Sequence, residues 1–510
     1  MKKILLCVVG LFSCVTLTFA QHIDRSKFIK DSLDFYINRA LTNWRIPGAA
    51  VCIVKDGKIV LMKAYGIKEL GLPAKVDINT LFMIGSNTKA FTATALAMLQ
   101  NDKKLSLDDK VTKYLPQFKL ADKPAGEMAV IRDLLCHRLG FQTFQGDFTF
   151  YNTNLTRSDI IQRLGMLKAA YPFRTRWGYT NAAFLTAGEI IPVVTGKPWE
   201  TYLKENIFAP LGMSNTLALT ADLPKSLNRT VPHTLIDGRL SPIPYCQIDG
   251  LAPAGGISSS VNDMSKWVLA LLNDGKVGAR QVIPLAAIQA TRQAQDIMGR
   301  VSHPDGSTNY ELYGLGWMIQ DYAGKHLIMH DGGVNGYLSS VTLVPEEHLG
   351  IVILTNTDQN NFFEALRWEI MDAYFKKQYR NYSDTYLAAY KNDAAAEQTA
   401  DKKLRDSVAL NPKPALLPAS YTGKYVNDLY GSLTITQGEN NDLEIRFEHH
   451  PKMFTHLQPL GGNRFYATFS DATLGKAVFP FMVQNGTVKG IKVKVADFVE
   501  RDPYEFTKAP

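Results

Sequence analysis

Ser86 and Lys89 are the first residues of this chain whose types and spacing could perform chemistry. They lie in LFMIGSNTKAFTATAL (81–96), whose second half is rich in Ala, Leu and Thr and predicts a buried helix. A lysine three residues after a helix-start serine places amine and hydroxyl on one face. Burial would lower the pKa of the lysine so that it takes the hydroxyl proton, and the first helical N–H groups could bind an oxyanion. The spacing predicts a serine nucleophile, although S-x-x-K alone more often marks a helix-capping serine and a surface lysine.

Tyr179 and Asn181 form a second candidate pair, in TRWGYTNA (175–182). A phenol beside a buried ammonium is expected to have a lowered pKa, so Tyr179 could accept the serine proton and pass it to a leaving group. Asn181 could hydrogen-bond the lysine and a substrate carbonyl. Taken alone, the stretch also fits an ordinary helix cap with an aromatic packing contact.

His330, Gly332 and Gly333 form a third candidate group after an expected strand at 326–329. Glycines at this position would let a substrate backbone lie close to an edge strand. The Gly333 N–H could then complete an oxyanion hole with the N–H of Ser86. A Gly-rich hairpin turn is the alternative.

The composition is that of a globular protein with a large core: 510 residues, 46% hydrophobic, 20% charged, net charge +8. No Lys/Arg run indicates nucleic acid or a membrane surface as a partner. Cys52, Cys136 and Cys246 are widely spaced and are interpreted as small buried residues, since no disulfide framework or metal motif contains them.

The N-terminal segment predicts export. Residues 1–20 combine a short basic start, an apolar stretch and a small-residue cleavage site before Gln21. This favours a signal peptide and a secreted or periplasmic protein without an integral membrane span after its removal. Lipidation at Cys14 is a weaker alternative, because the preceding residues fit a lipidation box poorly.

The elements that must position these residues alternate between helices and strands. We expect an amphipathic helix over 24–45, a hairpin of strands 49–54 and 59–65 around an Asp-Gly turn, and a mainly helical region over 128–220. Further along we expect a helix over 261–272, strands at 314–319, 326–329, 339–344 and 350–356, and a closing helix over 360–378. This order predicts an α+β fold: one antiparallel sheet flanked by helices, with an inserted helical subdomain.

The C-terminal part has a different pattern. A polar helix is expected over 384–409, followed by a Pro-rich boundary. Short alternating stretches then predict a small all-β, barrel-like domain, with strands at 433–436, 443–447, 465–469, 477–483 and 487–495. The predicted organisation is a signal peptide (1–20), a main domain (21–380), a helical linker (381–418) and a β-barrel-like domain (419–510).

The three candidate groups in this order resemble the serine β-lactamase/penicillin-binding-protein superfamily, in particular its class C-like branch of esterases, D-peptidases and acyltransferases. Other stretches are similar to that branch: LLCH (134–137), VTGKPW (194–199), IFAPLGM (207–213), PAGG (253–256) and YGLGW (313–317). The resemblance covers residues 25–378, with a fainter likeness of the C-terminal domain to an add-on of such hydrolases. It implies Ser86, Lys89 and Tyr179 as catalytic residues, and Asn181, His330, Gly332 and Gly333 as substrate or oxyanion residues.

Departures from the family pattern refine this expectation. His330 stands where β-lactamases and transpeptidases usually carry a carboxylate-binding lysine, which disfavours strong β-lactam hydrolysis. Arg138 and Arg174 occupy positions of small residues and could contact an acidic substrate group, with simple surface solvation as the alternative. No general-base glutamate loop is recognisable, so deacylation would depend on Tyr179 and Lys89.

Three functions remain open from the sequence. The first is an exported serine hydrolase acting through acyl-Ser86 on esters or amides, including D-amino-acid peptides. The second is an acyltransferase that passes the same acyl group to an alcohol or amine. The third is a non-catalytic, penicillin-binding-like sensor.

An α/β-hydrolase is disfavoured by the lack of a G-x-S-x-G motif. The expected partner is a small acyl compound or short peptide, no metal or organic cofactor is implied, and the role of the C-terminal domain is open.

Overall fold

The centre of the N-terminal part is an eight-stranded sheet in the order β2-β1-β14-β13-β12-β11-β10-β9. The structure, a computed structural model, describes residues 26–438 and 442–510, so the expected signal peptide lies outside the described residues. All strand pairs in this sheet are antiparallel, as predicted. The strands are β1 (Gly48–Lys55), β2 (Lys58–Gly66), β9 (Asp296–Ser302), β10 (Thr308–Tyr313), β11 (Met318–Tyr322), β12 (Lys325–Val334), β13 (Tyr337–Val344) and β14 (Leu349–Thr355).

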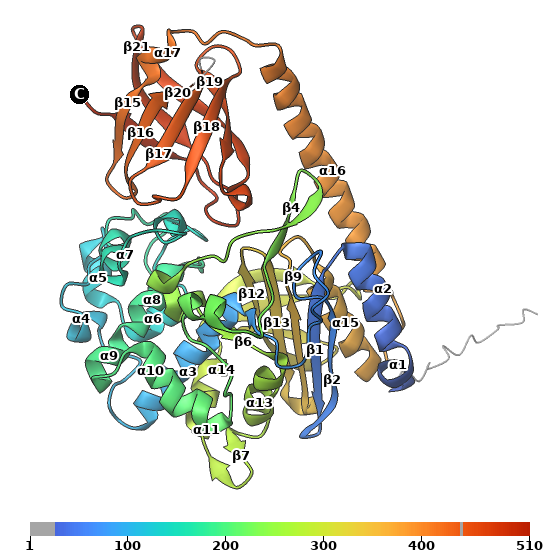
Figure 1. Cartoon of the computed structure of the whole chain (residues 1–510). Coiled ribbons are helices and arrows are strands. Elements are labelled where there is room, and N and C mark those ends of the chain that lie inside the picture. The colour runs from blue at the N-terminus through green and yellow to red at the C-terminus, as the bar shows by residue number, and fades with distance from the viewer. Residues whose placement is uncertain (1–25, 439–441) are drawn as a thin grey trace, which may run out of the picture.

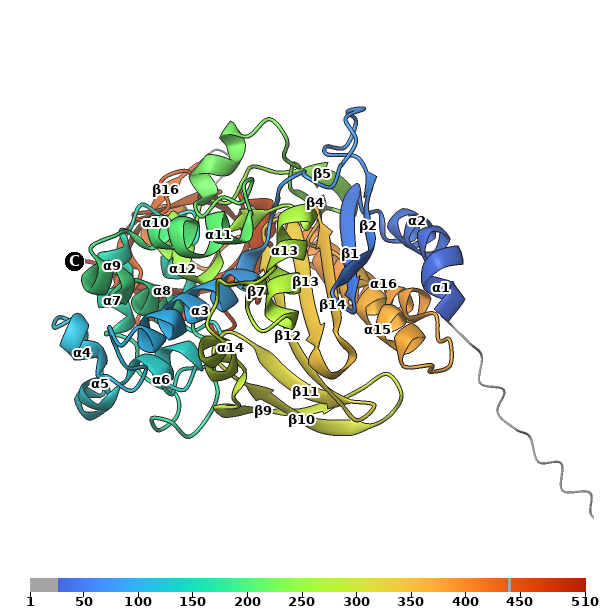
Figure 2. The same cartoon turned by 90° about the horizontal axis from the view of Figure 1, so that it is seen from below.

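The central strands are apolar on both faces because helices cover both sides. In β1, Val51 and Ile53 pack into one core, whereas Ala50 and Cys52 pack into the other. This alternation follows from the two-residue period of a strand. One face is covered by α1 (Ser26–Asp31), α2 (Leu33–Trp44) and α15 (Phe362–Tyr374), and the other by α3 (Thr88–Asn101) and α13 (Val261–Leu272), as Figure 2 shows.

Short helices form the subdomain beside the sheet, on the left in Figure 1. The fold class is therefore the predicted one, an α+β arrangement of an antiparallel sheet, flanking helices and an inserted helical region. Its helices are α4 (Val111–Tyr114), α5 (Lys123–Met128), α6 (Ile131–Leu135), α7 (Arg157–Leu164), α8 (Asn181–Gly188), α9 (Ile190–Thr195), α10 (Trp199–Leu203), α11 (Ala209–Leu211), α12 (Ala252–Gly255) and α14 (Leu285–Arg292).

The C-terminal strands close into an eight-stranded antiparallel barrel. Helix α16 (Tyr382–Ala409) runs from the sheet to this barrel (Figure 1). The strands are β15 (Gly423–Asn427), β16 (Gly431–Gln437), β17 (Leu443–Phe447), β18 (Phe454–Pro459), β19 (Arg464–Phe469), β20 (Lys476–Gln484), β21 (Thr487–Val493) and β22 (Tyr504–Lys508). The pairing of β15 with β22 closes the barrel.

The structure corrects several expectations about local elements. The expected strand over 314–319 is shifted to β11, β12 continues through His330 to Val334, and the barrel strands β15, β18 and β22 were not expected. The single helix over 24–45 is two helices, α1 and α2, because Ser32 has non-helical dihedrals (φ −127°) between them. Strands β9 and β10 were not expected. Most of their side chains are exposed or only half-buried, so no continuous apolar stretch marks these strands in the sequence.

Two further findings concern membranes and cysteines. No helix among the described residues is both long and apolar enough to cross a bilayer. Cys52, Cys136 and Cys246 are buried free thiols, which agrees with their interpretation as core residues.

Candidate active site

Ser86 lies in a single 3₁₀ turn, Gly85–Asn87, that leads directly into α3. Gly85 has a φ of +51°, and a Cβ at this residue would lie 2.9 Å from the Gly333 nitrogen. Glycine is therefore required both for its backbone conformation and for the close approach. The turn is held against the end of β12, which places Ser86 beside the glycines of the third motif.

Lys89 is fully buried one helical turn after Ser86. Its Nζ lies 3.0 Å from Ser86 Oγ, 2.7 Å from Asn181 Oδ1 and 2.8 Å from the Ala254 carbonyl oxygen. These three acceptors match the three N–H donors of an ammonium group. The lysine is thus held in one orientation and donates one of its hydrogen bonds to Ser86 Oγ, the candidate nucleophile.

Burial lowers the pKa of Lys89 to about 7, while the nearby Asp147 carboxyl raises it and limits the fall. A lysine with this pKa exists in both protonation states near neutral pH. It can therefore accept a proton from the serine hydroxyl and later return it.

Tyr179 lies against this pair, with Lys89 Nζ 4.6 Å from the centre of its ring. The expected lowering of its pKa is wrong: burial raises the pKa of Tyr179 and outweighs the opposing interaction with the Ser86 hydroxyl. Tyr179 is therefore a neutral phenol in the free site. It can act as a proton donor or relay, but it is not a preformed phenolate.

A chain of hydrogen bonds fixes His330 in a neutral form. The Thr180 N–H donates to His137 Nδ1 (3.0 Å), so His137 Nε2 carries the hydrogen and faces the Tyr313 hydroxyl at 3.3 Å. Tyr313 faces His330 Nε2 at 3.0 Å, and His330 Nδ1 donates to the Asp331 carbonyl at 2.7 Å. Burial and the Lys89 charge lower the pKa of His330 to about 4. The imidazole therefore supplies hydrogen bonds to the site and no positive charge.

The end of β12 is an open strand edge. Strand β11 pairs with β12 only from Lys325 to Met329, so residues 330–334 have a partner on the β13 side alone. Gly333 is exposed there, whereas a Cβ on Gly332 would lie 2.0 Å from the Ile84 carbonyl oxygen. Gly332 thus permits close packing beneath Ser86, and Gly333 leaves the edge accessible to a substrate backbone.

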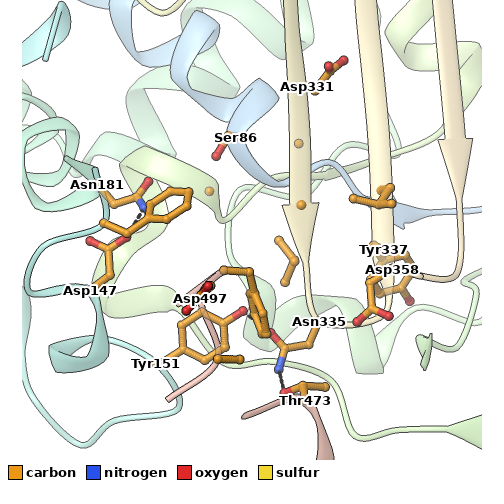
Figure 3. A pocket seen from close by; sticks show the side chains of 18 of the residues that line it. Ser86, Asp147, Tyr151, Asn181, Asp331, Asn335, Tyr337, Asp358, Thr473 and Asp497 are labelled. Atoms are coloured by element: carbon orange, nitrogen blue, oxygen red, sulfur yellow. Dashed lines mark hydrogen bonds between the residues drawn. The ribbon is translucent and has the colours of Figure 1, made fainter. Parts of the chain in front are cut away.

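These groups surround a cavity of about 890 Å³. Figure 3 shows Ser86 at the cavity, with the hydrogen-bonded Asn181 and Asp147 on one side and Asn335 and Thr473 on another. All seven predicted site residues except Lys89, which lies behind Ser86, line it. The barrel domain supplies part of the wall, namely Ala472, Thr473, Gly475, Ala496, Asp497, Phe498 and Arg501. The C-terminal domain therefore forms part of the cavity.

The sequence did not indicate Asp147, although its carboxylate accepts a hydrogen bond from Asn181 Nδ2 at 2.6 Å. Asp147 lies in the short turn η2 (Asp147–Thr149), outside any recognisable motif. The role of Glu500, a barrel residue bonded to that turn, was also missed. No local pattern marks either residue, because their partners are far away in the sequence.

Arg138 and Arg174 have a different role from the one expected. Both pair with the fully buried Asp133, Arg138 through Nε at 2.5 Å and Arg174 through Nη2 at 2.7 Å. They neutralise a buried carboxylate and attach the segments around residues 138 and 174 to α6. Neither residue lines the cavity.

No group of three or more His, Cys, Asp or Glu side chains suited to hold a metal occurs in the described ranges 26–438 and 442–510.

The sheet, the helical subdomain and the hydrogen-bonded pair of Ser86 and buried Lys89 define the β-lactamase/transpeptidase-like class of proteins. Within that class, the Beta-lactamase family model matches residues 33–375, and the chain belongs to this family.

Relatives support this assignment over most of the chain. Unguisins hydrolase ungD' of Aspergillus campestris is 29% identical over 431 residues, which cover 80% of this chain and 78% of the relative. The octameric penicillin-binding protein homologue from Pyrococcus abyssi has a TM-score of 0.61 at 21% identity, covering 93% of this chain and 99% of that one. A D-stereospecific amidohydrolase from Streptomyces has a TM-score of 0.53 at 21% identity, covering 64% and 94%. The chain is therefore a member of a β-lactamase-fold family whose relatives include hydrolases.

Proposed function

We propose that the protein is an exported serine hydrolase that forms an acyl-enzyme through Ser86 on ester or amide substrates, including peptides with D-amino acids. The observation that carries this proposal is the Lys89 amine, fully buried, 3.0 Å from Ser86 Oγ and with a pKa of about 7. The name of the unguisins hydrolase supports a hydrolytic reaction, and that of the D-stereospecific amidohydrolase supports amides as substrates.

In the proposed first half-reaction, neutral Lys89 accepts the Ser86 proton while Oγ attacks the substrate carbonyl. The backbone N–H groups of Ser86 and Gly333 bind the developing oxyanion. The protonated lysine returns the proton through the Tyr179 hydroxyl to the leaving group, which departs and leaves the acyl group on Ser86. In the second half-reaction, water gives a proton to Lys89 while its oxygen attacks the acyl carbon. The bond from that carbon to Ser86 Oγ then breaks, the protonated lysine returns the proton to Oγ, and the acid leaves.

The site also indicates which substrates fit poorly. His330 is neutral above about pH 4, and Arg138 and Arg174 are occupied by Asp133. The position where β-lactamases place a carboxylate-binding cation is therefore uncharged here. We expect simple esters and amides to acylate Ser86 faster than β-lactams.

The test is labelling of the whole protein with a fluorophosphonate probe and with an activated ester, followed by mass spectrometry. We expect one adduct on Ser86 and a rate that rises with pH through about 7, because only neutral Lys89 accepts a proton. Ser86→Ala should abolish the adduct, whereas Ser302→Ala, an exposed serine, should keep it. Equal labelling of Ser86→Ala would refute the nucleophile, and no adduct at all would favour a non-catalytic binding protein.

Acyl transfer at the same site is a second candidate, favoured by the barrel residues that cover part of the cavity. A covered acyl-enzyme can exclude water long enough for another acceptor to react. Product analysis with added alcohols or amines distinguishes the two reactions. If free acid remains the only product at all acceptor concentrations, the protein is a hydrolase.

Export is a separate part of the proposal and rests on residues 1–20. We expect the protein secreted by a bacterial host to begin at Gln21. N-terminal sequencing of the exported protein tests this, and an intact N-terminus in the cytosol would contradict it. Acylation of Cys14 would indicate the lipoprotein alternative.

A further inference from the structure

Asp147 is a buried carboxyl group, 3% exposed, that reaches the lysine network through one intermediate residue. Asn181 Nδ2 donates to Asp147 Oδ2 at 2.6 Å, and Asn181 Oδ1 accepts from Lys89 Nζ at 2.7 Å (Figure 3 shows the first contact). The three side chains form one line of hydrogen bonds that ends at the candidate base.

The direction of these bonds depends on how the Asn181 amide is turned. A side-chain amide has an acceptor and a donor end that exchange when it rotates by 180°. A carboxylate only accepts and an ammonium only donates, so one orientation satisfies both neighbours. The other orientation would place the NH₂ against Lys89 and the oxygen against Asp147. Asp147 therefore selects the orientation that Lys89 requires.

The barrel holds the backbone on both sides of Asp147. The Glu500 carboxylate accepts from the Gly146 N–H at 2.8 Å and from the Phe148 N–H at 3.4 Å. Tyr430, also in the barrel, donates to Glu500 at 2.6 Å. Glu500 is only 3% exposed, so these bonds form away from water.

Phe148 reinforces this attachment. Its fully buried ring belongs to the hydrophobic core of the barrel. It stacks on His450 with 4.1 Å between ring centres and an angle of 19°, and it also stacks on Tyr504. A residue of the main domain thus fills part of the barrel interior, directly beside Asp147.

We propose that Asp147 is a positioning residue that fixes the Asn181 amide for Lys89, and that the barrel holds Asp147 in place through Glu500 and Phe148. The role in catalysis rests on the proposed function of Ser86 and Lys89, whereas the orientation of the amide does not.

Asp147 selects the amide orientation in its ionised form, which Lys89 and Asn181 stabilise and burial disfavours. The Asp147 charge raises the pKa of Lys89 against the effect of burial, and burial in turn raises the pKa of Asp147 well above its usual range. Glu500 adds to that rise, and Lys89 opposes it. Other titratable groups facing these two residues are Tyr179, His137 and His330 around Lys89, and Tyr151 and Tyr430 around Asp147.

Asp147→Asn tests the positioning role, because it removes the charge at nearly constant shape. Without the carboxylate the ammonium form of Lys89 loses stabilisation, so the acidic limb of the kcat/KM profile for an activated ester should move to lower pH by about one unit. The maximal rate should fall about tenfold, because the amide is no longer held in one orientation. Asp406→Asn, an exposed residue of α16, is the matched control and should change neither value.

Glu500→Gln tests the role of the barrel. A glutamine has one acceptor oxygen for the two backbone N–H groups, so we expect a smaller shift in the same direction and a severalfold loss of rate. Glu505→Gln, which changes an exposed glutamate of β22, is the matched control. Unchanged profile and rate in Glu500→Gln would overturn the role of the barrel.

A second measurement is independent of activity. Titration of Lys89 by NMR in full-length protein labelled with [ε-¹³C]lysine, assigned with Lys89→Met, reports its protonation directly. We expect the midpoint to be lower in Asp147→Asn than in the wild type. An unchanged midpoint overturns the proposal, even if activity falls. If the wild type forms no adduct on Ser86, the proposed function is wrong. The titration still shows whether Asp147 acts on Lys89, because it does not depend on activity.

Discussion

Two buried polar networks meet at the cavity. Burial lowers the pKa of one basic group in each, but the charge at neutral pH differs between them. One contains Lys89, whose pKa falls from 10.5 to about 7. The other contains His330, whose pKa falls from 6.5 to about 4. The lysine thus becomes the group that changes charge near neutral pH, whereas the histidine stays neutral above about pH 4. Histidine is usually the side chain that titrates near neutral pH, and lysine usually stays charged. In this site desolvation exchanges these two roles.

The placement of carboxylates explains why the networks stay distinct. Asp147 lies beside the lysine network and limits the fall in its pKa. Asp331 lies next to His330 in sequence, but Arg367 binds its carboxylate at 2.9 and 3.0 Å. Asp331 raises the pKa of His330, but burial and the Lys89 charge lower it by more, so the imidazole is neutral.

The largest expected effect comes from removing the lysine. Lys89→Met should lower the rate of Ser86 acylation about 10³-fold, because the serine loses its general base. Acylation by the fluorophosphonate probe, followed over time, measures it. Lys402→Met, an exposed residue of α16, is the control. Acylation of Lys89→Met at the wild-type rate would show that the two networks do not differ in catalytic role.

The next largest effect concerns how the free energy of unfolding falls on acidification, to which His330 contributes. Because the pKa of His330 is depressed in the folded state, the unfolded chain binds its proton first as the pH falls below 6.5. The contribution of His330 to the free energy of unfolding is therefore fully present above pH 6.5 and is lost as the pH falls to about 4. His330→Gln should make this fall shallower by up to about 3 kcal/mol, measured by urea unfolding at several pH values.

His326→Gln is the control for that experiment. The hydrogen bond to Glu346 raises the pKa of this exposed histidine, so its contribution is present below pH 6.5 and is lost as the pH rises through the folded pKa. Its removal should make the fall on acidification steeper. Equal pH dependence of the wild type and His330→Gln would contradict a neutral buried His330.

The smallest effect is expected in the middle of the histidine network. Tyr313→Phe leaves His137 Nε2 and His330 Nε2 without their shared hydroxyl, which should cost about 2 kcal/mol of unfolding free energy. Acylation should fall less than tenfold, since no charge moves through this network. Tyr310→Phe, at an exposed position, should change neither quantity. A loss comparable to that of Lys89→Met would mean that the histidine network transfers protons as well.

Local sequence predicted the parts of the site that follow one another along a single element. Ser86 and Lys89 are three residues apart on one helix start, and their hydrogen bond was expected from that spacing. The Asp-Gly hairpin between β1 and β2 and most barrel strands were likewise visible as alternation and turn residues. In each case the physical cause acts over a few residues.

What the sequence could not predict depends on partners distant in the chain. The pKa of Tyr179 rises because many segments together bury it, and this outweighs the hydrogen bond with Ser86 that lowers it. Arg138 and Arg174 looked available because their partner Asp133 is identified only by folding. Strands β15 and β22, which close the barrel, pair the two ends of a domain.

The contact between Glu500 and Gly146 joins residues separated by 354 positions. A chain made from its N-terminus therefore exposes the loop of Asp147 long before the residue that clasps it has been synthesised. An unfinished polypeptide would contain Ser86 and Lys89 but would lack the contact from Glu500 that holds the Asp147 loop. If the proposed role of the barrel is correct, we expect Ser86 to become reactive only after the last barrel strands have been synthesised and have folded.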